Sequence, residues 1–308
     1  MLARNSVWEV PIASAYFFSC LGFWLLFLGW NGNSRRWGRL LLASVAFGLA
    51  VGSRPHFVVA VAGFGGFWVW LWAARFRLSG RFESGLFLRE ALALFLPLAL
   101  TGVGLLIYNY QRFGNALEFG IRYQLGGYSQ LNLKLMSVKF IPINFYLEFL
   151  APAQIERYFP FFQVIRGYPG IRPENWGGAE DPYGILTNMP FTWLALLAPI
   201  IWAVSFRSLR AVGAWLLVFG LGFCSVAFSV LCFGGACNRY MVDFLPMLLL
   251  VGAIGMLMAG TLGSSLLIRA VYRIGIFAGV AYHAGTFGGD RGNPVERGSF
   301  DFEPTGER

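Results

Sequence analysis

Charged residues are scarce in this 308-residue sequence, at 13% of the chain. A soluble domain carries roughly 25% charged residues to cover its surface. Lysine is nearly absent, since Lys134 and Lys139 are the only lysines and the other cations are arginines. This shortage of charge excludes an ordinary water-soluble protein, because too few polar groups are available to face water.

Cysteine is also sparse, and its placement argues against metal and redox chemistry. Three of the four cysteines, Cys20, Cys224 and Cys232, lie inside apolar runs, where cysteine behaves as a small hydrophobic residue. The sequence shows no metal-ligand spacing, no disulfide framework, no nucleotide-binding fingerprint and no nucleophile elbow. It therefore predicts neither a metal site nor a cofactor.

Hydrophobic residues, in contrast, make up 57% of the chain and gather in long continuous runs. Such runs are typical of transmembrane helices, whereas the strands of a membrane barrel alternate. The sequence predicts an all-α polytopic bundle with about seven spans. The expected spans are 11–30, two short helices within 40–74, 91–109, 191–206, 211–233 and 244–268.

The arginines predict how these spans are oriented. They form four clusters, at 35–39, 75–89, 207–210 and 269–273, and the spans between them place all four on one side. Because basic loops stay in the cytoplasm, the N-terminus is expected outside. The net charge of +9 is thus attributed to cytoplasmic loops and not to nucleic-acid binding. Between 40 and 74 the chain must cross twice, so Arg54 and His56 are expected at an outer hairpin tip.

Two segments lie outside the spans. Residues 110–190 form a long outer segment that is rich in aromatic residues, so we expect it to be ordered. Within it, 141–150 resembles a helix along the membrane surface, and 166–184 reads as turns. The domain prediction is a bundle at 1–268, including this segment. Residues 269–308 are predicted to be a short cytoplasmic apolar piece and a disordered tail.

Charges near the outer boundary are the candidate functional residues, because charge at membrane depth usually marks a site or an ion pair. Arg239 and Asp243 are four residues apart, which suits a salt bridge at a helix end. Alternatively, Arg239 grips a lipid-linked phosphate, for which a guanidinium is well shaped. Arg54 either binds the same phosphate or extends toward lipid headgroups. His56 is expected to be an interfacial anchor rather than a catalytic group.

A second group of residues follows the span at 91–109. Its aromatic side chains either form the interfacial belt or line a groove for a sugar or a polyprenyl chain. No catalytic residue is predicted, since Glu118 has no partner at a recognisable spacing. The proposed groove residues are Tyr108, Tyr110, Arg112, Glu118, Arg122, Tyr123 and Asp243.

Four segments in order resemble bacterial membrane glycosyltransferases of the GT-C type, close to lipopolysaccharide and mannosyl transferases. The segments are GLAVGSRPHFV (48–58), YNYQRFGNALEFGIRYQL (108–125), NFYLEFLAP (144–152) with FPF (159–161), and NRYMVDFLP (238–246). The resemblance implies a bacterial plasma-membrane protein that takes a sugar from a polyprenyl-phosphate donor on the outer face. It also implies that Arg54 and Arg239 hold the donor phosphate.

One departure from that family shapes the expected function. Such enzymes carry acidic catalytic residues in a first outer loop, whereas here only Glu9 precedes the first span. We therefore expect the C-terminal part of such a protein, with its catalytic acid outside this chain. The rival interpretations are a non-catalytic membrane protein that binds or moves a lipid-linked glycan, and an inactive truncation product. The expected partners are membrane lipid and a polyprenyl-phosphate sugar.

Overall fold

The computed structural model describes residues 9–31, 36–120, 135–155, 172–180, 183–189, 191–204 and 210–261, with 123, 157, 162–163, 273 and 277. The helices are α1 (Glu9–Asn31), α2 (Arg36–Ser53), α3 (Phe57–Ser79), α4 (Ser84–Phe113), η2 (Val138–Phe140), α5 (Ile141–Phe145), η3 (Tyr146–Leu150), α6 (Ile185–Asn188), α7 (Thr192–Val204), α8 (Arg210–Leu231) and α9 (Asn238–Thr261). Four two-residue strands form two small pairs. These are β1 (Gln154–Ile155) with β2 (Phe162–Gln163), and β3 (Ala179–Glu180) with β4 (Ala236–Cys237). The all-α class predicted from the sequence is confirmed.

Within the described residues, five helices are long and apolar enough to cross a membrane. They are Val10–Trp30, Phe57–Arg77, Ser84–Phe113, Val212–Leu231 and Asn238–Met258. The chain is thus a membrane-embedded protein, but the expected number of about seven spans is not reached by length and composition. The remaining two expected spans correspond to α2 and α7. Two arginines occupy the first turn of α2, and the 13 residues of α7 reach only about 20 Å.

Close packing of α1 against α2 depends on small residues. A Cβ atom at Gly22 would lie 2.8 Å from the ring of Phe47, and one at Gly29 would lie 3.0 Å from Leu40. Residue numbers rise along α1 as they fall along α2, so the two helices are antiparallel. Pairs of helices that pack together also include α2 with α4, α3 with α8, and α7 and α8 with α9.

The break between α2 and α3 falls where the sequence predicts it. Pro55 has no N–H to continue the helix, and the chain turns at Arg54–His56 before α3 begins at Phe57. The amide of Phe57 then donates to the carbonyl oxygen of Arg54 at 3.1 Å. Arg54 therefore lies at the end of α2 opposite to Arg36, about 27 Å away along an 18-residue helix.

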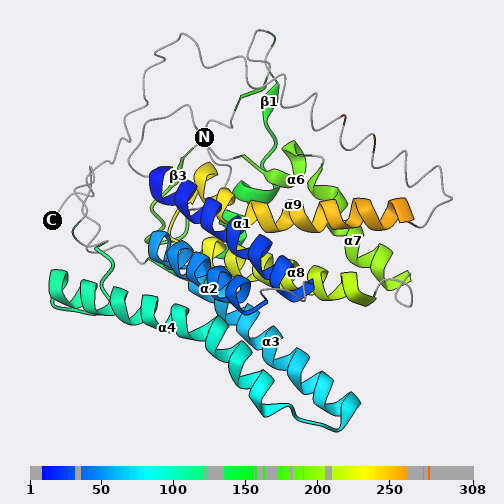
Figure 1. Ribbon diagram of the computed structural model, residues 1–308. Coiled ribbons are helices and arrows are strands. Elements are labelled where there is room, and N and C mark those ends of the chain that lie inside the picture. Colours follow the sequence, from blue (N-terminus) through cyan, green and yellow to red (C-terminus); the bar gives the residue numbers. More distant parts are fainter. Residues whose placement is uncertain are drawn as a thin grey trace.

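Figure 1 shows that the two ends of the bundle differ. The α2–α3 turn and the start of α9 lie at one end, whereas the α3–α4 connection and the end of α9 lie at the other. The C-terminal half of α4 projects beyond the neighbouring helices, and its side chains are largely exposed. Polar residues at the α2–α3 turn and the α9 start can therefore meet at one end.

The helix expected at 141–150 is present as the continuous series η2, α5 and η3. It is packed into the protein at one end of α8, and Phe140, Leu147 and Glu148 are each at most 1% exposed. The side-chain amide of Asn144 donates to the carbonyl oxygens of Leu231 at 2.9 Å and Phe233 at 2.7 Å. The helix is confirmed, but it is enclosed by protein on more faces than a helix resting on a membrane surface.

A buried carboxylate holds three helices together near the start of α4. Glu90 is 1% exposed and pairs with Arg36 of α2 through one oxygen. Its other oxygen accepts from the indole nitrogens of Trp68 at 3.2 Å and Trp72 at 2.8 Å, both from α3. The acid is thus compensated by one cation and two donors, as a buried carboxylate requires.

Candidate functional site

A charged cluster, formed by Arg54, His56, Glu148 and Asp243, lies at the end of the bundle where α9 begins. Asp243 is its centre. Its side chain is 1% exposed, and one of its oxygens binds the guanidinium of Arg54. His56 Nε2 lies 3.1 Å from that same oxygen, at an angle that does not make a hydrogen bond. The cluster thus joins the α2–α3 turn to α9, over a long sequence separation.

The pairing of Arg239 with Asp243 that the sequence suggested is wrong. Asp243 points inward to Arg54, whereas Arg239, the second residue of α9, pairs with Glu180 at 2.6 Å. The four-residue spacing brings side chains together only where both lie on the same face and neither has a better partner. Here tertiary packing supplies a different partner to each.

Glu180 reaches Arg239 because β3 pairs with β4. In this parallel pair Glu180 lies opposite Cys237, two residues before Arg239. The Cys237 sulfur lies 3.6 Å from Glu180 Oε2, and burial raises the pKa of the thiol to about 12. Cys237 is therefore an uncharged thiol at neutral pH. The Glu180 side chain is 40% exposed, so this carboxylate is partly open to the surroundings.

The side chains of Arg54 and Arg239 converge on one aromatic ring. The guanidinium carbon of Arg54 lies 5.5 Å from the Tyr240 ring centroid, and that of Arg239 lies 5.9 Å from it. Taken together, these distances leave the two guanidiniums at most about 11 Å apart. Two arginines more than about 20 Å apart could not both reach one phosphate group at hydrogen-bond distance. The geometry therefore permits a shared anion.

Glu148 is a member of this cluster that the sequence did not point to. It lies in η3, is 1% exposed, and neither carboxyl oxygen has a hydrogen-bond partner within the described protein. Burial, with a smaller contribution from the charge of Asp243, raises the pKa of Glu148 well above its ordinary value. The sequence signal for Glu148 was a single acid inside the apolar run 141–150. This signal did not indicate burial, because a helix on the membrane surface would present the acid to water.

Apart from Asp243 and Arg122, the predicted groove residues lie in or just after the projecting end of α4. Arg112 donates to the Tyr108 hydroxyl at 3.2 Å, and Tyr123 stacks on Phe113 with ring centroids 5.0 Å apart. Tyr108, Tyr110 and Tyr123 are more than half exposed. Glu118 accepts from the amide of Gly120 at 2.8 Å, which makes it part of a local turn. Arg122 lies outside the described residues, and the groove itself stays a prediction.

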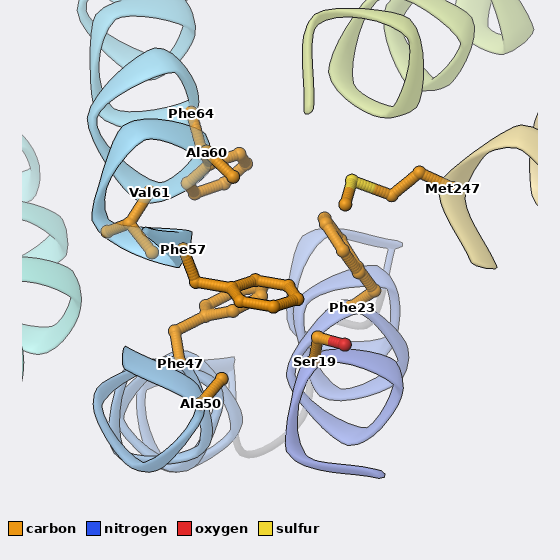
Figure 2. Close-up of a pocket in the computed structure, with 9 residues that line it drawn as sticks. All are labelled: Ser19, Phe23, Phe47, Ala50, Phe57, Ala60, Val61, Phe64 and Met247. Atoms are coloured by element: carbon orange, nitrogen blue, oxygen red, sulfur yellow. The ribbon is translucent and has the colours of Figure 1, made fainter. Parts of the chain in front are cut away.

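An apolar pocket lies beside the charged cluster, between α1, α2, α3 and α9. Figure 2 shows the rings of Phe23, Phe47 and Phe57 turned toward one another, with Met247 closing the α9 side. Phe57 follows His56, and Met247 is one helical turn after Asp243. The volume of about 10 Å³ is that of roughly one water molecule. A lipid chain therefore does not fit here without displacing side chains.

No protein-family model matches this chain, and neither a curated protein nor a solved structure matches it.

Proposed function

We propose that this membrane protein binds the phosphate of a lipid-linked sugar at Arg54 and Arg239 and serves in transferring that sugar, as GT-C glycosyltransferases do. The observation that carries the proposal is the convergence of both guanidiniums on Tyr240 at one end of the bundle. A guanidinium offers several N–H donors in a planar fork that matches phosphate. A headgroup arriving there could therefore be held from two sides.

The acid partners of the two arginines indicate which contact a bound phosphate would replace. The two arginines are neutralised by Asp243 and Glu180, of which Asp243 is 1% exposed and Glu180 is 40% exposed. Glu180 is thus the carboxylate that a phosphate would replace, because it can return to water at little cost. In this account Asp243 keeps Arg54 in place, while Arg239 exchanges its carboxylate partner for the phosphate.

The binding half of the proposal is tested with a polyprenyl phosphate and the protein in lipid nanodiscs. We expect Arg239→Gln to weaken binding roughly ten- to a hundredfold, because a charge-assisted contact to phosphate is lost. Arg75→Gln is the matched control, since Arg75 also pairs with an exposed glutamate, Glu83, at 3.3 Å but at the other end of the bundle. Unchanged affinity in Arg239→Gln, or an equal loss in both variants, would contradict phosphate binding at this site.

The transfer half needs a separate measurement. Labelled polyprenyl-phosphate mannose is incubated with the nanodisc-embedded protein and cell-envelope glycans, and the movement of label is followed. Transfer that is lost in Arg239→Gln supports the glycosyltransferase. Binding without transfer would leave the phosphate site standing and remove the transfer reaction from this chain by itself, as expected for a membrane protein that only holds or carries the lipid-linked glycan or for one whose catalytic acid is supplied from outside the chain.

A further inference from the structure

Buried polar atoms without a partner are concentrated in the charged cluster. Among the described residues, six buried side-chain nitrogen or oxygen atoms have no hydrogen-bond partner in the protein, and five belong to this cluster. They are Arg54 Nε, His56 Nε2, both carboxyl oxygens of Glu148, and Asp243 Oδ1. Native proteins pair nearly all such atoms, so a concentration of them calls for an explanation. A bound polar ligand would provide partners for all five, as would bound water, and the experiment below separates the two.

The chemistry of these atoms restricts the ligand. Arg54 Nε can only donate a hydrogen bond, and the ionised Asp243 can only accept one. Because burial raises the pKa of Glu148, its carboxyl keeps its proton to a higher pH than an exposed glutamate does, and the protonated form both donates and accepts. A fully ionised phosphate only accepts and would leave Asp243 Oδ1 unpaired. A hydroxyl group donates and accepts, so it complements the whole set.

The local packing holds Glu148 beside Asp243. The ring of Phe149 stacks on that of Phe244, with centroids 5.4 Å apart and planes 6° from parallel. Each of these aromatic residues directly follows one of the acids, so the stack clamps η3 against the first turns of α9. A five-residue π-helical turn such as η3 is uncommon and frequently occurs at functional sites.

We propose that Glu148, together with Asp243 and Arg54, forms a subsite for hydroxyl groups of the sugar carried on the lipid phosphate. This inference rests on the proposed function and adds the residue that distinguishes a glycosylated lipid phosphate from a bare one. Arg54 connects the two parts of the site, because it pairs with Asp243 and also lies over Tyr240, which Arg239 contacts as well. In this arrangement Arg239 and Arg54 hold the phosphate, and Glu148 selects the sugar.

The test compares two probes, decaprenyl phosphate and decaprenyl-phosphate mannose, bound to the protein in nanodiscs. Glu148→Met removes the carboxyl while keeping a side chain of similar length. We expect it to weaken binding of the mannosylated lipid roughly tenfold and to leave the bare phosphate within about twofold. Glu148→Gln, which still donates and accepts, is expected to retain most of the affinity for the mannosylated lipid. Arg239→Gln is expected to weaken both probes by the same factor.

Each remaining outcome overturns the inference in a recognisable way. If wild-type protein binds both lipids and Glu148→Met changes neither, the partnerless atoms hold water only, and the proposed phosphate site survives. Equal weakening of both lipids by Glu148→Met would likewise deny Glu148 a role in sugar selection. If wild-type protein binds neither lipid, the proposed function fails and the inference fails with it. Thermal unfolding of the variants identifies loss of fold, which Glu148→Met should not cause because it removes a buried carboxyl.

Discussion

Arg54 and Asp243 are 189 residues apart in the sequence and form an ion pair at one end of the bundle. Arg54 comes from the turn that separates α2 from α3, and Asp243 comes from the first turns of α9. The Asp243 side chain is 1% exposed and that of Arg54 is 19% exposed, so water screens the pair only weakly. The pair both holds two distant parts of the chain together and aims one guanidinium at the candidate site.

Removing the cation of this pair is expected to destabilise the protein. Arg54→Met leaves the buried charge of Asp243 without its arginine partner, and we expect the free energy of unfolding to fall by about 3 kcal/mol. The double variant Arg54→Met with Asp243→Leu should recover most of that loss, since no unpaired charge stays buried. Denaturant unfolding in detergent micelles measures both.

The matched control is Arg75→Met, which breaks the exposed pair with Glu83 and should cost less than about 1 kcal/mol. A double variant as unstable as the sum of its two single variants would show that Arg54 and Asp243 do not act as a pair.

Glu148 is expected to make stability depend on pH. Its folded-state pKa is raised above the ordinary value of 4.5, so the folded protein binds a proton more tightly than the unfolded chain. The stabilising contribution of Glu148 is fully present below about pH 4.5, the ordinary pKa value. It is lost as the pH rises through the folded-state pKa. Glu148→Gln cannot titrate and should be free of this loss.

Unfolding curves of the wild type and of Glu148→Gln, recorded from about pH 4.5 upward, provide the measurement. The difference in unfolding free energy, wild type minus variant, should fall as the pH rises, because the other titrating groups are common to both proteins. A difference that stays constant would rule out a raised pKa at Glu148.

Glu90 should be essential for the packing of α2, α3 and α4. Glu90→Ala leaves Arg36 and two indole N–H groups without their acceptor, and we expect a loss of about 3 kcal/mol or more. Glu90→Gln keeps an oxygen for the indoles and should be milder. Tryptophan fluorescence follows the same change, because Trp68 and Trp72 lose a hydrogen bond in the alanine variant. An unaltered spectrum and unaltered stability in Glu90→Ala would contradict this role.

The helices could be predicted from the sequence because their cause is local. Continuous apolar runs define α1 and α8 to within two residues, whereas α9 begins at Asn238 rather than at 244, and its expected end at 268 lies outside the described residues. The break at Pro55 was also predictable, since a proline in the middle of a long apolar run removes a backbone donor. Of the two expected spans that do not qualify, α7 is too short with 13 residues, whereas α2 has 18 residues but carries two arginines in its first turn.

The candidate site was predictable only in part because its contacts are tertiary. Arg54 and Arg239 stood out as charges beside spans, and the structure brings both against Tyr240. Their acid partners could not be assigned from spacing. Glu180 depends on the pairing of β3 with β4, and Asp243 depends on how α9 faces the α2–α3 turn. Glu148 was missed because its burial follows from the packing of η3 against α9, which no local pattern reveals.

We propose that the charged site at the α2–α3 turn of this membrane-embedded bundle faces outward, while the arginine-rich end faces the cytoplasm. Gly52 and Gly85 form a matched pair for testing it, because each is exposed and a Cβ atom at either would meet no other atom within 4 Å. They lie at opposite ends of the bundle, near Arg54 and near the α3–α4 connection. The background for the test is a chain whose four native cysteines are replaced by alanine.

The measurement is labelling of intact bacterial cells, producing either Gly52→Cys or Gly85→Cys, with a maleimide that does not cross membranes. The account predicts that Gly52→Cys reacts and that Gly85→Cys reacts only after the cells are opened. Labelling of both positions in intact cells, or of Gly85→Cys alone, would contradict it.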